Sequence, residues 1–286
     1  MLRTIKLTIY FFLYQALFSM LFLWVECDWD FIRLINTMKT GQAIVPSVTN
    51  LSLSVILSGI AMIWHLLHFK YVKFSLKNFS ELSGKTIWIS IPFIVASMVF
   101  INLCSEFLNL SDNMQDIFRS MSRNLLGILS ITIMAPLVEE LLFRGAIQGH
   151  LLRIGIKPFY AILISSLVFG VVHGNPIQIP FAFSFGLILG WLYYRTGNLA
   201  ISIIGHFINN SIACIQMAVM TKEEFNTKTI EWLGEGPTYA LFAISLAVTI
   251  GMFLYLKKRL PAAPDYTSPS CHPEQGEGSE VINPIK

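Results

Sequence analysis

Runs of about 20 apolar residues recur along this chain of 286 residues and restrict its fold more than any other feature. A helix rises about 1.5 Å per residue, so a run of this length crosses the roughly 30 Å hydrocarbon core of a bilayer. Hydrophobic residues make up 54% of the chain and charged residues only 13%, which excludes an ordinary soluble domain. The sequence therefore predicts an all-α membrane protein, a bundle of about eight transmembrane helices.

Eight apolar runs are predicted to span the membrane. They lie at about 7–25, 50–68, 86–105, 124–152, 158–174, 179–194, 198–220 and 238–256. The first run is too long for the apolar core of a signal peptide and lacks a small-residue cleavage site after it, so we expect a retained helix. From Pro261 the chain is rich in Pro, Ser, Glu and Gly, a composition that cannot bury enough apolar surface to fold.

The distribution of basic residues predicts the orientation of the bundle. Thirteen basic residues lie in segments on the same side as the N-terminus and six on the other side. The thirteen are Arg3, Lys6, Lys70, Lys73, Lys77, Lys85, Arg153, Lys157, Arg195, Lys257, Lys258, Arg259 and Lys286, and the six are Arg33, Lys39, Arg119, Arg123, Lys222 and Lys228. We expect both termini in the cytoplasm, and the short loops favour a bacterial inner membrane. The net charge of +3 follows from this topology and does not indicate nucleic acid.

The strongest functional signal is a pair of acidic residues, Glu139 and Glu140, inside the fourth run. An ionised carboxylate at the centre of a membrane helix costs about 2.5–3.5 kcal/mol, and Leu would pack better. Glu140 and Arg144 are four residues apart and can form an ion pair, which could also serve only to pin two helices. Glu139 is turned about 100° away, has no such partner in its own helix, and is suited to act as a general base. Pro136 should kink the helix before the pair.

Three further polar residues lie in the fifth and seventh runs. Phe169 and His173 are four residues apart, so an aromatic ring should flank the imidazole. His206 and Asn210 have the same spacing and can bind a metal or hydrogen-bond a developing oxyanion. Each group taken alone has a structural alternative, because polar residues often link helices in membrane bundles. Together they supply a base, metal ligands and oxyanion donors, the groups that amide hydrolysis needs.

These residues resemble the motifs of the CPBP family, membrane enzymes that include CAAX prenyl proteases and bacteriocin-processing proteins and are also called Abi proteins. Glu-Glu-x-x-x-Arg occurs at 139–144, Phe-x-x-x-His at 169–173 and His-x-x-x-Asn at 206–210. The first motif alone is a weak pattern, but three motifs in the family's order, each in a predicted membrane helix, are specific. The resemblance covers about 124–212, roughly a third of the chain.

The resemblance implies an intramembrane endopeptidase of the kind that trims prenylated tails or leader peptides. Glu139 would activate the attacking water with the help of His173, His206 and Asn210 would stabilise the oxyanion, and the Glu–Arg pair would keep the site in shape. In the metalloprotease version of the family, His173 and His206 would hold a divalent metal such as zinc. We favour water activated by glutamate, because Asn is a poor zinc ligand and the chain has no His-Glu-x-x-His.

Two other functions remain open. Buried Glu and His residues also mark proton-coupled transporters and relays, although the polar residues cluster in one half of this chain without an inverted repeat. A non-catalytic membrane scaffold or immunity protein could retain the same motifs. For a protease we expect a peptide or protein substrate, prenylated or membrane-anchored, that is presented from the lipid bilayer.

These interpretations divide the chain into four parts and predict one close helix contact. The parts are three N-terminal spans with an interfacial loop (1–123), a catalytic core (124–220), an outer loop with the last span (221–260), and a disordered cytoplasmic tail (261–286). Within the core, Gly186-x-x-x-Gly190 is predicted to be a small-residue packing face.

Overall fold

The computed structural model describes residues 2–40 and 46–268, and this part of the chain is predominantly helical. The helices of ten residues or more are α1 (Leu2–Glu26), α2 (Phe31–Thr40), α3 (Val48–His68), α5 (Gly84–Glu106), α10 (Pro158–Val171), α11 (Gln178–Thr196), α12 (Leu199–Val219) and α15 (Glu235–Arg259). A continuous rod, residues 125–153, consists of α7 (Leu125–Leu129), η1 (Ser130–Met134), α8 (Ala135–Glu140), η2 (Leu141–Gln148) and α9 (Gly149–Arg153). The short helices are α4 (Lys77–Glu81), α6 (Gln115–Met121), α13 (Lys222–Asn226) and α14 (Thr229–Leu233).

Every predicted span coincides with a helix, and six of these helices have the length and composition of a membrane span. Among the described residues, six helices are long and apolar enough to cross a membrane, namely α1, α3, α5, the rod, α12 and α15. The other two predicted spans are α10, with 14 residues, and α11, with 19 residues. At about 1.5 Å per residue, α10 is about 21 Å long, shorter than the hydrocarbon core. The protein is a helical, multi-pass integral membrane protein, and a count of eight crossings stays a prediction.

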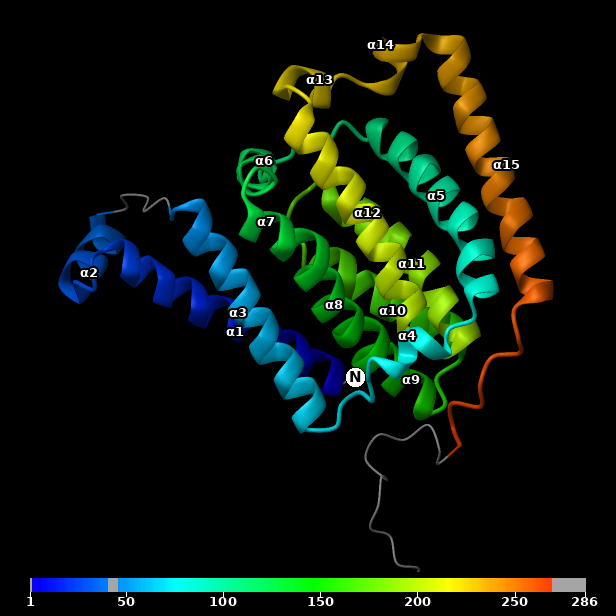
Figure 1. Ribbon diagram of the computed structural model, residues 1–286, viewed down its shortest axis with the longest axis horizontal. Coiled ribbons are helices and arrows are strands. Elements are labelled where there is room, and N and C mark those ends of the chain that lie inside the picture. The colour runs from blue at the N-terminus through cyan, green and yellow to red at the C-terminus, as the bar shows by residue number, and fades with distance from the viewer. Residues whose placement is uncertain (1, 41–45, 269–286) are drawn as a thin grey trace, which may run out of the picture.

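Contacts between connecting segments define one end of the bundle, called the Arg3 end below. The guanidinium carbon of Arg3 lies 4.6 Å from the centre of the Tyr71 ring, in the segment that follows α3. Asn198, before α12, donates from Nδ2 to the backbone carbonyl of Asn78 at 2.8 Å. The start of α1 and the connections after α3 and α11 therefore lie at the same end of the bundle (Figure 1).

A second set of contacts holds the opposite end together. Thr229 donates from Oγ1 to Oε1 of Glu106 at 2.7 Å, which joins the end of α5 to α14. Arg119 of α6 donates to the backbone carbonyl of Met220 at 2.5 Å, just beyond α12. The described connections thus alternate between the two ends, as an up-and-down bundle requires, and the side that faces the cytoplasm stays a prediction.

The rod lies between two helix pairs. The α1–α3 pair flanks it on one side and the α5–α15 pair closes the other side of the bundle (Figure 1). Two apolar cores fill the space between them. One contains Leu7, Leu66, Leu141, Phe143 and Phe169, and the other contains Phe93, Leu189, Ile201 and Leu256. This arrangement buries the middle of the rod, where Glu139 and Glu140 lie.

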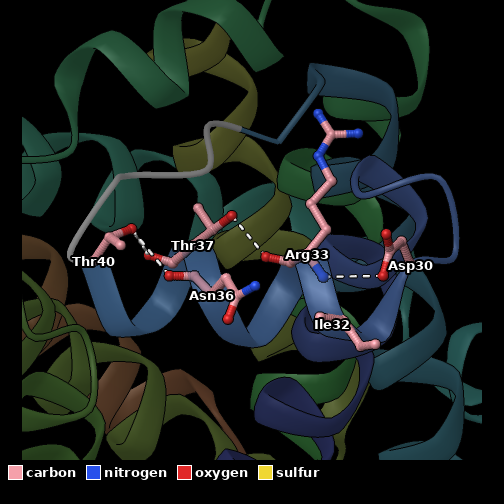
Figure 2. A pocket seen from close by; sticks show the side chains of 6 residues that line it. All are labelled: Asp30, Ile32, Arg33, Asn36, Thr37 and Thr40. Atoms are coloured by element: carbon pink, nitrogen blue, oxygen red, sulfur yellow. Dashed lines mark hydrogen bonds between the residues drawn. The ribbon is translucent and has the colours of Figure 1, made fainter.

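Two segments outside the long helices bear on the sequence predictions. Residues 261–268, the first part of the predicted tail, pack along the Arg3 end, where Tyr266 is 8% exposed and its hydroxyl donates to the carbonyl of Tyr193 at 3.0 Å. Residues 269–286 lie outside the described residues. Helix α2, which the sequence patterns did not predict, borders an open cavity of about 350 Å³ (Figure 2). That cavity is lined by Asp30, Ile32, Arg33, Asn36, Thr37 and Thr40 and is therefore separate from the buried acidic pair.

Candidate active site

The rod changes its helical form on both sides of the acidic pair. Segments η1 and η2 are π-helical, so each N–H bonds to the carbonyl five residues back. Pro136 contributes to this change, because its nitrogen carries no hydrogen for the carbonyl of Ile131. Asn210 of α12 donates from Nδ2 to that same carbonyl at 2.9 Å. The proline therefore leaves a backbone carbonyl without a helical partner, and a polar residue from another helix satisfies it.

This contact gives Asn210 a role in linking helices. Its Oδ1 accepts a hydrogen bond from Nδ2 of Asn209 at 3.0 Å, while its own Nδ2 holds the carbonyl of Ile131. A side-chain amide carries two hydrogens, so Asn210 has a second one to donate. The predicted oxyanion role is compatible with this geometry and stays a prediction.

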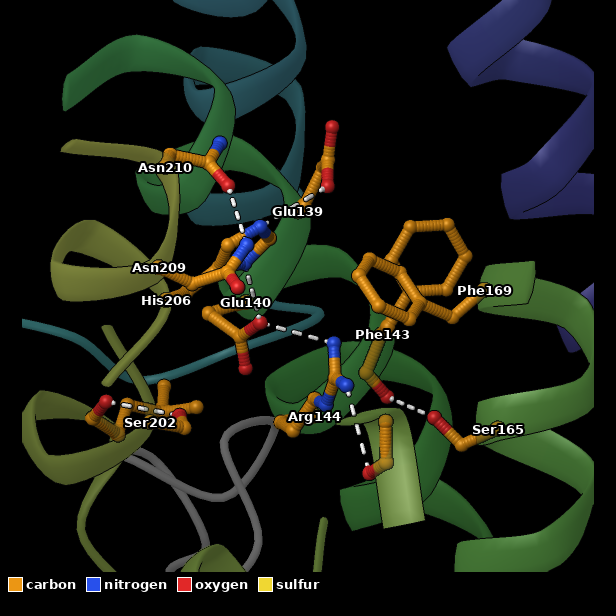
Figure 3. Close-up of polar contacts among 12 residues, drawn as sticks. Glu139, Glu140, Phe143, Arg144, Ser165, Phe169, Ser202, His206, Asn209 and Asn210 are labelled. Carbon is orange, nitrogen blue, oxygen red and sulfur yellow. Dashed lines mark hydrogen bonds and ion pairs between the residues drawn. The ribbon is translucent and has the colours of Figure 1, made fainter. Parts of the chain in front are cut away.

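Glu140 and Arg144 form the predicted ion pair (Figure 3). Arg144 donates from Nη1 to Oε1 of Glu140 at 2.8 Å, and the two side chains are 0% and 1% exposed. Arg144 also donates to the backbone carbonyl of Gly186 at 3.4 Å, and its guanidinium lies 4.2 Å from the centre of the Phe169 ring. A buried charge is tolerated when it is paired and hydrogen-bonded, and these contacts supply partners for Arg144 and for Oε1 of Glu140, while Oε2 of Glu140 has no donor among the described residues.

His206 connects the two carboxylates. Its Nδ1 lies 2.8 Å from Oε1 of Glu140, and its Nε2 lies 3.8 Å from Oε2 of Glu139. If Nδ1 donates its hydrogen to the Glu140 carboxylate, a neutral imidazole presents its lone pair from Nε2 toward Glu139. Because Oε1 of Glu140 accepts from both Arg144 and His206, it fixes the orientation of the imidazole.

Glu139 differs from its neighbour in exposure and in partners. Its side chain is 16% exposed and points away from Glu140 (Figure 3). Within the described part of the chain, its Oε2 is buried without a hydrogen-bond donor. A carboxylate oxygen in this state can accept a hydrogen bond, and then a proton, from a water molecule.

Phe169 places His173 at the edge of the same cluster. The centre of the Phe169 ring lies 4.9 Å from the centre of the His173 ring and 5.6 Å from that of His206, with both pairs edge-on. The sequence predicted His173 inside a span at 158–174, but α10 ends at Val171 and His173 lies in the turn that follows. Its Nδ1 lies 2.7 Å from the carbonyl oxygen of Phe169, to which it can donate.

A polar contact that the sequence did not predict lies behind the ion pair. Gln148 is fully buried and donates from Nε2 to the carbonyl of Gly190 at 2.8 Å, one turn from the bond between Arg144 and the carbonyl of Gly186. The predicted packing face of α11 therefore also presents carbonyl oxygens to the rod. The signal was present in the four-residue spacing of Glu140, Arg144 and Gln148, which matches that of the two glycines.

The residues that would hold a metal do not form a ligand set. Within residues 2–40 and 46–268, we find no group of three or more His, Cys, Asp or Glu side chains placed to bind a metal ion. Glu140 is already neutralised by Arg144, and Nδ1 of His206 is committed to Glu140. A catalytic zinc ion takes three protein ligands, and the metal role of His173 and His206 stays a prediction.

Fold and site together define a helical, multi-pass membrane protein with a buried Glu–Arg–His cluster. Residues 121–212 match the family model described as type II CAAX prenyl endopeptidase Rce1-like. The matched region contains all six predicted site residues, and it confirms the family resemblance that the motifs indicated.

Three curated proteins are each similar to about a third of the chain. The protein of Bacillus subtilis (strain 168) named "Putative membrane peptidase YdiL" is 32% identical over 105 residues, which is 37% of this chain and 43% of that protein. "Membrane-embedded CAAX protease MroQ" of Staphylococcus aureus (strain USA300) is 35% identical over 91 residues, 30% of this chain and 36% of that protein. The uncharacterized protein YpbD of Bacillus subtilis is 27% identical over 99 residues, 33% of this chain and 48% of that protein. The matches thus span less than half the length of each relative, and no solved structure matches the chain.

Proposed function

We propose that this protein is an intramembrane endopeptidase of the CAAX type, in which Glu139 activates the water that attacks a peptide bond. The observation that carries the proposal is the arrangement of Glu139 and His206. The Oε2 atom of Glu139 is buried without a hydrogen-bond donor among the described residues, and it lies 3.8 Å from an imidazole that Glu140 and Arg144 hold in place. The similarity to a family of CAAX endopeptidases supports the reaction class.

The proposed reaction consumes one water molecule and regenerates the Glu139 carboxylate. Glu139 takes a proton from the water, and the oxygen attacks the carbonyl carbon of the substrate. The negative charge that develops on the carbonyl oxygen is stabilised by Asn210 and by His206, which donates from Nε2 when both of its ring nitrogens carry hydrogen. The carbon–nitrogen bond then breaks, and the proton held by Glu139 passes to the leaving amine. His173 assists Glu139 from the turn after α10, and no step is assigned to a metal.

The substrate in this proposal is a peptide or protein segment delivered from the bilayer, with a prenylated or membrane-anchored tail. The Arg3 end faces the cytoplasm of a bacterial cell, because most basic residues belong to the segments at that end. Labelling of single cysteines tests the orientation. A cysteine at Lys77 should react with a membrane-impermeant reagent only after the cells are opened, whereas one at Lys222 should react in intact cells.

The decisive experiment compares three forms of the protein in cells. Wild type, Glu139→Gln and the exposed control Glu223→Gln are expressed, and new peptide N-termini in the membrane fraction are sequenced. New ends should appear with wild type and the control and vanish with Glu139→Gln. If the same ends persist in Glu139→Gln, this residue has no catalytic role. If wild type generates none, the scaffold or transporter interpretation replaces the protease.

A further inference from the structure

The turn between α10 and α11 carries both His173 and a buried asparagine, Asn175. Gly174 stands between them with a φ of +64°, a left-handed conformation that glycine adopts without steric strain. Pro176 follows directly and restricts Asn175 to an extended backbone. The backbone carbonyl of Asn175 then accepts the N–H groups that start α11, from Gln178 at 2.9 Å and Ile179 at 3.1 Å.

The side chain of Asn175 joins this turn to the segment between α5 and α6. It is 1% exposed, its Oδ1 accepts from the backbone N–H of Asn113 at 3.1 Å, and its Nδ2 donates to Oδ1 of Asp112 at 2.8 Å. A backbone hydrogen bond from Ile177 to the carbonyl of Ser111, at 3.3 Å, runs beside them. Asn175 therefore uses both ends of its amide to hold two segments that are about 60 residues apart in the sequence.

The segment that Asn175 grips is itself ordered by local contacts. Oδ1 of Asp112 also accepts the backbone N–H of Met114 at 3.1 Å, which fixes the carboxylate at the start of α6. Asp112 thus offers a fixed acceptor, and the bonds of Asp112, Asn113 and Asn175 form a unit that is called the Asn175 clamp below.

His173 depends on this clamp because it lies beyond the last residue of α10. Its imidazole is tethered to the carbonyl of Phe169 at 2.7 Å, and its backbone N–H bonds to the carbonyl of Gly170 at 3.3 Å in a turn that no further helical residues support. We propose that Asn175 is a positioning residue, which holds the turn so that His173 keeps its place beside Phe169 and the Glu139 site. This inference rests on the proposed function, because it assigns Asn175 an effect on the same reaction.

A reciprocal exchange of side chains tests the proposal. Asn175→Asp places two carboxylates together, whereas Asp112→Asn combined with Asn175→Asp restores one amide donor and one carboxylate acceptor. With a farnesylated, internally quenched peptide as the probe, Asn175→Asp should lower kcat by about 10- to 100-fold at nearly unchanged KM, because small displacements of a catalytic group have effects of this size. The double variant should return kcat to within about threefold of wild type.

Asn226→Ala is the matched control. It breaks a bond of Asn226 to Gln115, also between connections at this end of the bundle but away from the turn of His173. This control should leave kcat within about twofold of wild type. A loss of kcat in Asn175→Asp that the double variant does not recover, or an equal loss in Asn226→Ala, would overturn the positioning role.

Hydrogen exchange in the unliganded protein separates this inference from the proposed function. Asn175→Asp should speed amide exchange in peptides covering 109–114 and 171–178, with the rod unchanged, and the double variant should restore protection. If the wild type cleaves the peptide, two results would overturn the clamp while leaving the protease in place. One is that Asn175→Asp exchanges its amides as slowly as the wild type, and the other is that its kcat equals that of the wild type. A wild type that cleaves nothing, with exchange following the clamp, would overturn the proposed function instead.

Discussion

Glu140 and Arg144 form a buried ion pair, and replacing Glu140 should destabilise the protein more than replacing Arg144. Glu140→Met leaves a guanidinium that cannot lose its proton in a site that is 1% exposed, and loss of one partner of a buried pair costs about 3–5 kcal/mol. Arg144→Met leaves a carboxylate that keeps the N–H of His206 and can take up a proton. Its cost should be nearer that of one charged hydrogen bond, about 1.5–3 kcal/mol.

The double variant reveals whether the two charges are coupled. Replacing both members of a buried pair by apolar residues of similar volume is often neutral, so Glu140→Met with Arg144→Met should be more stable than Glu140→Met alone. Lys222→Met is the control, because it breaks an ion pair of 2.7 Å to Asp116 whose side chains are 48% and 74% exposed. That change should cost less than about 1 kcal/mol.

The free energy of unfolding can be measured by denaturant titration of the purified protein in detergent micelles. The reasoning would be refuted if Glu140→Met were no more destabilising than Lys222→Met. It would also fail if the effects of the two single substitutions simply added in the double variant, because additivity shows that the residues do not interact.

Three further outcomes are expected. A Cβ at Gly190 would lie 2.8 Å from Oε1 of Gln148, so Gly190→Ala should lower the unfolding free energy by about 1–3 kcal/mol. The control is Gly251→Ala, which has open space around it and should be neutral or stabilising in the same denaturant titration. Arg119→Met removes a cation from the last carbonyls of α12 and should cost about 1–2 kcal/mol, against little change for the exposed Arg123→Met. Incubation with a zinc chelator should leave peptide cleavage within about twofold, and a loss that added zinc restores would contradict a reaction driven by glutamate alone.

The parts of the structure that follow from local spacing were predictable from the sequence. Apolar runs of membrane length located every long helix of the bundle, because such segments have few alternatives in lipid. The ion pair between Glu140 and Arg144 was also predictable, since four residues bring two side chains together on one helix. The contact of His206 with Glu140 was not, because the rotation of one helix against another depends on packing that a single sequence does not reveal.

The sequence contained a signal for the end of α10, but the apolar pattern around it led to a longer predicted span. Val171 and Val172 continue the apolar pattern, which favoured a span that reaches 174. Asn175 precedes Pro176, and a residue before proline disfavours helix, so a helix end before this pair could have been predicted. The contact of Asn175 with Asp112 could not have been predicted, because Asp112 lies in a connection whose path depends on the packing of the whole bundle.

The position of both members of the ion pair on one helix has a consequence for biogenesis. Helices enter the bilayer in the order of their synthesis, and a charge at the centre of a membrane helix costs about 2.5–3.5 kcal/mol on insertion. Because Arg144 is one turn from Glu140, the rod can neutralise both charges during its own insertion, before the helices that follow it in the sequence enter the bilayer. The later helices then pack around an ion pair that has already formed, so insertion of the two charged residues does not depend on contacts from those helices.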